Sequence, residues 1–109
     1  MPPLISYDIK FPEGFHKYAW EVEAKGWLPD ILITINHHHY RVTFYDPTRL
    51  AQDVESELRG CPAFFQSNLV VVSHVTPACM ESAIASIVAA GTYAGMVQEE
   101  ESTQETVCP

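Results

Sequence analysis

Two stretches of the chain carry the same signal for a helix that follows a strand, and this repeated signal most constrains the fold. In each, a polar capping residue precedes a proline: Asp46 before Pro47, and Thr76 before Pro77. Proline suits the first helical position because the N–H it lacks has no partner there. Apolar residues then recur at three- and four-residue spacing, which is typical of a helix with one buried stripe. We predict helices over residues 47–59 and 77–90.

A strand is expected before the second helix, over residues 68–75. Its centre, Val70 to Val72, is a run of three valines, typical of a strand that is covered on both faces. We therefore expect an interior strand. Two strand–helix units in succession imply parallel strands joined by a right-handed crossover.

The chain before Asp46 is interpreted as strands. The segment LISYDIKF can run as a strand, and Pro12 and Gly14 then break it. In residues 17–25 the apolar side chains of Tyr18, Trp20 and Val22 alternate with charged ones, which predicts a strand with one solvated face. Further strands are predicted at residues 31–36 and 39–45, with a tight hairpin turn at Asn36-His37-His38, because asparagine tolerates a positive φ.

These elements predict an α+β fold in two layers. The sheet is mixed: an N-terminal antiparallel meander is followed by a β-α-β-α half, and two helices pack against it. A chain of 109 residues is long enough for one core and too short for two ordinary domains. We predict one globular domain over residues 1–98 and an acidic C-terminal tail over residues 99–109.

Charge and cysteine content narrow the classes of function. The net charge of −8 has the wrong sign for a protein that binds nucleic-acid phosphates or anionic lipid. No apolar stretch is long enough to span a membrane. The three cysteines are an odd number without CxxC spacing, which argues against a disulfide framework and a zinc ribbon and favours a reducing cytosol. We expect a cytoplasmic protein that binds neither nucleic acid nor membrane.

The run His37-His38-His39 is the first candidate for chemistry. In an extended chain His37 and His39 point to the same side, so they could contribute two ligands to a metal. A stable site needs at least one more ligand. A solvated hairpin tip is the favoured interpretation, and we expect neither a metal nor a cofactor.

Cys79 is the second candidate. It lies three residues after Thr76, in the first helical turn, where free N–H groups and the helix dipole lower the pKa of a thiol. His74, at the end of the preceding strand, could act as its base. A structural cysteine packed beside Met80 is the favoured interpretation.

Two pairs of carboxylates, Asp53 with Glu57 and Glu21 with Glu23, have spacings that could serve acid–base catalysis. Each pair is expected on the solvated side of its element, so ordinary surface charge is the favoured interpretation. No dinucleotide-binding, P-loop, HExxH, EF-hand or GxSxG motif is present.

Our first hypothesis is a non-catalytic protein that binds another protein, as an inhibitor or adaptor of a basic partner. The acidic charge would steer such a partner and the aromatic side chains would anchor it. The alternatives are a thiol-dependent enzyme that uses Cys79 and His74, and a metal-binding domain that uses His37 and His39. The candidate residues for binding a partner are Trp20, Trp27, Glu21, Glu23, Asp53 and Glu57.

Overall fold

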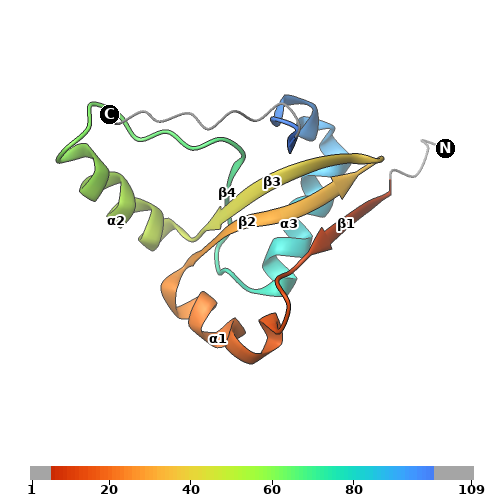
Figure 1. Cartoon of the computed structure of the whole chain (residues 1–109), viewed down its shortest axis with the longest axis horizontal. Helices are drawn as coiled ribbons and strands as arrows, with labels where there is room; N and C mark the ends of the chain where they lie inside the picture. The colour runs from red at the N-terminus through yellow and green to blue at the C-terminus, as the bar shows by residue number, and fades with distance from the viewer. Residues whose placement is uncertain (1–5, 100–109) are drawn as a thin grey trace.

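The structure, a computed structural model, describes residues 6–99. Four strands form one mixed sheet in the order β1-β2-β3-β4; β1, β2 and β3 are antiparallel neighbours, and β4 runs parallel to β3. The α+β class with a mixed sheet is confirmed (Figure 1). The elements in chain order are β1 (Tyr7–Lys10), α1 (Phe15–Lys25), β2 (Trp27–Ile35), β3 (His38–Tyr45), α2 (Pro47–Leu58), β4 (Leu69–Val71), α3 (Pro77–Ala90) and the 3₁₀ helix η1 (Thr92–Gly95).

One face of the sheet carries the core. Alternate side chains of β2 and β3 point to this face, because successive residues of a strand project to opposite sides. They are completed by the apolar stripe of α3 and by residues of α1. The buried core includes Ile31, Ile33 and Ile35 of β2, Val42 and Phe44 of β3, Met80, Ile84 and Val88 of α3, and Phe15 and Val22 of α1.

Both predicted helix starts are confirmed. The carboxylate of Asp46 accepts a hydrogen bond from the Arg49 N–H at 2.7 Å, and the hydroxyl of Thr76 accepts one from the Cys79 N–H at 3.3 Å. The apolar stripe of α3 is buried as expected. That of α2 is not: no residue of α2 is buried, because this helix lies at one end of the sheet and not across it (Figure 1).

The strand predicted over residues 17–25 is wrong, because this segment is the helix α1. The side chains that turn toward the core, those of Phe15, Tyr18, Ala19 and Val22, are spaced by three and four residues, which is the period of a helix. The alternation around Trp20 fits a strand only by coincidence. Trp20 therefore faces solvent, with 69% of its surface exposed.

The interior strand predicted at Val70 to Val72 is also wrong. The parallel pairing with β3 is confirmed, but β4 contains three residues and lies at the end of the sheet. Val71 is 47% exposed, whereas Val72 is buried just beyond the strand. The three valines therefore have different environments: Val71 is exposed in the edge strand, and Val72, just after the strand, is buried in the core.

The hairpin between β2 and β3 turns at Asn36 and His37, as predicted. Both have a positive φ, 50° and 73°, as a type I′ turn requires.

The division of the chain into a domain and a tail at residue 98 stays a prediction, since residues 100–109 lie outside the described part. Glu99 itself forms an ion pair with Arg41, at 2.7 Å. No helix within residues 6–99 combines the length and apolar character needed to cross a membrane.

Candidate functional site

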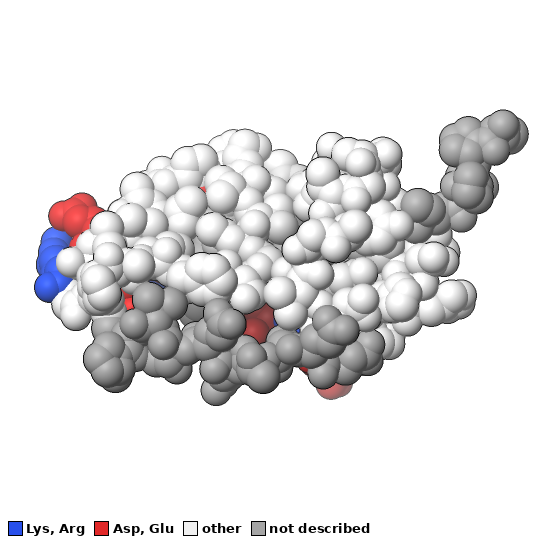
Figure 2. Space-filling model, turned by 90° about the horizontal axis from the view of Figure 1, so that it is seen from above, with Lys and Arg blue, Asp and Glu red and all other residues white. Residues whose placement is uncertain are grey.

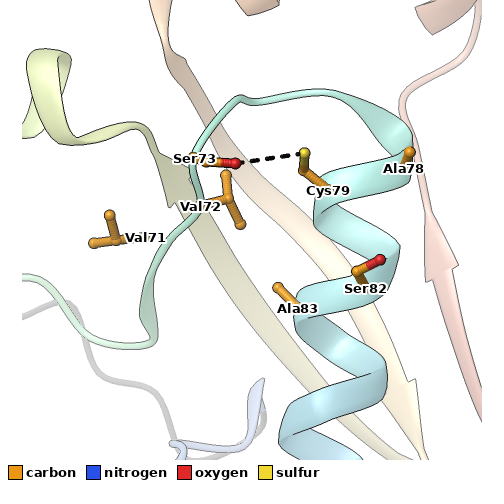
Figure 3. A pocket seen from close by; sticks show the side chains of 7 residues that line it. All are labelled: Val71, Val72, Ser73, Ala78, Cys79, Ser82 and Ala83. Atoms are coloured by element: carbon orange, nitrogen blue, oxygen red, sulfur yellow. Dashed lines mark hydrogen bonds between the residues drawn. The ribbon is translucent and has the colours of Figure 1, made fainter.

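Among residues 6–99, a hollow of about 420 Å³ lies in front of Cys79. It lies between the end of β4, the loop that follows, and the first turns of α3 (Figure 3). Residues 72–76 connect β4 to α3, and Thr76 and Pro77 begin the helix. The lining residues are Val71, Val72, Ser73, Ala78, Cys79, Ser82 and Ala83.

The thiol of Cys79 is free and partly exposed. Its sulfur lies 3.8 Å from the Ser73 hydroxyl (Figure 3). Hydrogen bonds from Thr76 and Ser73 lower the pKa of Cys79, and a backbone hydrogen bond from His74 adds to the effect; partial desolvation and the nearby charge of Glu23 oppose it. These contacts stabilise the thiolate form relative to that of an unperturbed cysteine, in the direction expected for the first turn of a helix.

The alternative pair of Cys79 with His74 has no hydrogen bond between the thiol and the imidazole among the described residues. His74 is exposed, and it is absent from the residues that line the hollow. It reaches the thiol through its backbone. The neighbour that sequence reasoning missed is Ser73, which lies six residues before Cys79 and comes close to it only because the chain turns between β4 and α3.

A second cluster joins α2 to the sheet. Asp53 accepts hydrogen bonds from the Tyr45 hydroxyl at 2.8 Å and from the Arg49 guanidinium at 2.9 Å, and that guanidinium lies over the Trp27 ring, 5.1 Å from its centroid. Burial, and then the bond to Asp53, raise the pKa of Tyr45 to about 12. Asp53 was expected on the solvated side of its helix. It is instead bound on the sheet side, which gives this cluster a structural role.

Trp27, a candidate for binding a partner, packs within this cluster, under the guanidinium of Arg49. It is partly buried, and its indole nitrogen is buried without a hydrogen-bond partner among the described residues. The indole N–H nevertheless lowers the pKa of the nearby Tyr45 hydroxyl. This effect is smaller than the rise in that pKa caused by burial and by Asp53. Trp20, in contrast, is largely exposed.

The other candidate carboxylates are Glu21, Glu23 and Glu57. On the helix α1, Glu21 and Glu23 are two residues apart, so they point to different sides. The expectation that they share a strand face is wrong. Glu57 is exposed on α2, while Asp53 is held by Tyr45 and Arg49.

The histidine run is divided between the turn and the strand. His37 lies in the turn, and the ring of His39, in β3, is hydrogen-bonded to the Thr34 hydroxyl at 3.0 Å. Within residues 6–99 no three His, Cys, Asp or Glu side chains gather as a metal site requires. His37 and His39 thus lack the third ligand that the sequence argument demanded.

Comparison of the chain with protein-family models, with curated proteins and with solved structures gave no match. The function is therefore inferred from the chain's own residues.

Proposed function

We propose that this protein acts by binding another protein that has a basic surface, as an inhibitor or adaptor. The observation that carries the proposal is the exposure of Trp20, which is 69% exposed on α1. Tryptophan is enriched among the residues that dominate binding energy at interfaces, because it offers a large and rigid apolar surface. A tryptophan left in water also adds nothing to the protein's own core.

The negative charge of the protein is the reason that we propose a basic partner. Glu21 and Glu23 are exposed on the Trp20 helix, which also exposes Lys17 and Lys25, so the acidic character comes from the whole chain, with its net charge of −8. Figure 2 shows one face on which few charged atoms are visible away from one end and one margin. The net charge of −8 favours the approach of a basic partner by long-range attraction.

The kinetics of a complex with the protein that co-purifies from the native cell test the proposal. Raising the salt concentration from 0.01 to 0.15 M shortens the screening length from about 30 to about 8 Å. The association rate should then fall substantially, and the dissociation rate should change much less.

The variant Trp20→Ala should keep the fold and speed dissociation by about tenfold or more. A matched control is Leu58→Ala, which removes an exposed apolar side chain from α2 and should leave the rate unchanged. A salt-independent association rate, together with unchanged dissociation from Trp20→Ala, would contradict the proposal.

Thiol chemistry at Cys79 is the second candidate. It is favoured by the hollow in front of the sulfur and by the hydrogen bonds that stabilise the thiolate. It lacks a side-chain base, since His74 contributes only its backbone. Alkylation of the thiol as a function of pH is the measurement that separates it from a purely structural cysteine.

A cytoplasmic location is part of the proposal. The free thiol of Cys79 supports a reducing compartment. Cys61, however, is disulfide-bonded, which departs from the expected picture and counts against such a compartment, because disulfides persist mainly under oxidising conditions. Fractionation of the native cell would decide between the two.

A further inference from the structure

The outer edge of β1 has no strand beside it among residues 6–99. The strand lies at one end of the sheet (Figure 1) and pairs only with β2, in the register that places Ile9 opposite Ile33. An edge of this kind presents backbone N–H and C=O groups that can pair with a further strand.

The hydrogen bonds of the ladder show which residues offer those groups. The Ser6 carbonyl accepts a hydrogen bond from the Asn36 N–H at 2.9 Å, so Ser6 points its backbone toward β2. In an antiparallel pair this direction alternates along the strand. Asp8 and Lys10 therefore also point their backbone groups toward β2, and positions 7 and 9 point theirs outward.

The charged side chains of β1 are arranged so that two copies of the strand, laid antiparallel, place opposite charges next to each other. Tyr7 and Ile9 project to the core face, and Asp8 and Lys10 project to the opposite face. Both charged residues are exposed, and neither forms an ion pair with another described residue. The order is thus aromatic, acid, aliphatic, base, and Phe11 follows as a second aromatic.

We propose that two copies of this chain associate through β1, antiparallel, about a twofold axis at Ile9. In this register Asp8 faces Lys10 of the second copy, and Lys10 faces its Asp8. On the other face Ile9 meets its counterpart, and Tyr7, which is 40% exposed, meets Phe11 of the second copy. The two sheets then continue into one another, with the same patch used on both copies.

Charge selects this register over the others. If one strand is shifted by one residue, residues whose backbone groups point toward the second copy lie opposite residues whose backbone groups point toward β2. The hydrogen bonds between the two β1 strands then cannot form. A shift of the axis to Asp8 or to Lys10 would place that residue opposite its own copy, which brings like charges together. The register about Ile9 forms two opposite-charge pairs and no like-charge pair, which gives the contact its specificity.

Sedimentation velocity of the full chain over a range of concentrations tests the proposal. The expected species has twice the mass of the 12.2 kDa chain. Asp8→Lys and Lys10→Asp should each raise the dissociation constant by about tenfold or more, because both cross-strand pairs become repulsive. Mixed in equal amounts, the two variants should form a heterodimer, since lysines on one copy then face aspartates on the other.

The controls make the same changes of net charge on α1. Glu23→Lys and Lys17→Asp alter exposed residues and should leave the dimer intact, and circular dichroism confirms that each variant folds. A monomer at all concentrations would overturn the proposal. So would a dimer that single charge reversals at β1 leave unchanged, or a mixture of the two β1 variants that stays monomeric. Loss of partner binding in Trp20→Ala does not bear on this result, because Trp20 lies on α1.

Discussion

At the scale of single residues, the Tyr45 hydroxyl is the contact that ties α2 to the sheet. It donates to Asp53 at 2.8 Å from a side chain that is only 3% exposed. Tyr45→Phe should lower the free energy of unfolding by about 1–2 kcal/mol, since Asp53 loses a hydrogen bond to a charged acceptor. Urea denaturation measures the loss. Tyr7→Phe, which alters an exposed tyrosine, is the control and should have almost no effect.

The same residue predicts a dependence of stability on pH. The pKa of Tyr45 is raised from 10.0 to about 12 in the folded protein, so folding favours the neutral phenol. Its contribution to stability is complete below pH 10 and is lost as the pH rises from about 10 to 12. Unfolding curves over this range should show a smaller fall in stability for Tyr45→Phe than for the unchanged protein. Equal falls would contradict the prediction.

Cys79 provides the second residue-scale prediction. Its hydrogen bonds from Thr76 and Ser73 lower its pKa, so alkylation should begin at a lower pH than for the same cysteine in the urea-unfolded chain. Ser73→Ala should move the alkylation profile toward higher pH without unfolding the protein, because one donor to the thiolate is lost. Identical profiles in the folded and unfolded chains would show that the local contacts do not activate the thiol.

At the scale of elements, the edge position of β4 predicts different outcomes at neighbouring valines. Val71 is 47% exposed and Val72 is 7% exposed. Val72→Asp should cost several kcal/mol of a total stability of about 5–15, because it buries an unpaired charge. Val71→Asp should cost about 1 kcal/mol or less, since an exposed edge accepts a charge. Thermal unfolding of the two variants makes the comparison, and equal losses would contradict the edge assignment.

The junction between α1 and β2 carries a further prediction. Gly26 has a φ of +70°, and a side chain there would collide with the carboxylate of Asp46, the residue that caps α2. Gly14 has a φ of +73° and open space around it. Gly14→Ala should therefore cost about 1–2 kcal/mol from backbone strain alone. Gly26→Ala should cost about 1–3 kcal/mol more, because Asp46 cannot move away without losing its bond to the Arg49 N–H. Urea denaturation of both variants tests the difference.

At the scale of the whole molecule, the sequence by itself determined the features that depend on a few neighbouring residues. The capping of α2 and α3, the turn at Asn36, the buried stripe of α3 and the α+β class were all predicted. Each follows from the chemistry of adjacent side chains: a capping oxygen within reach of free N–H groups, a residue that tolerates positive φ, or apolar residues at the helical period. The placement of Cys79 in a first helical turn was predictable for the same reason.

The tertiary structure decided every feature that depends on what lies beside an element. Residues 17–25 satisfy two periods, and only packing of Phe15 and Val22 against the core selects the helix, which leaves Trp20 in solvent. Val71 was expected in the interior but is exposed, because it lies in the edge strand of the sheet. Asp53 was expected in solvent but lies on the sheet side of α2, because it accepts a hydrogen bond from Tyr45. The hydroxyl of Ser73 lies close to the sulfur of Cys79 because the chain turns between β4 and α3. Burial and contact are properties of the neighbours in space, and a linear pattern does not contain them.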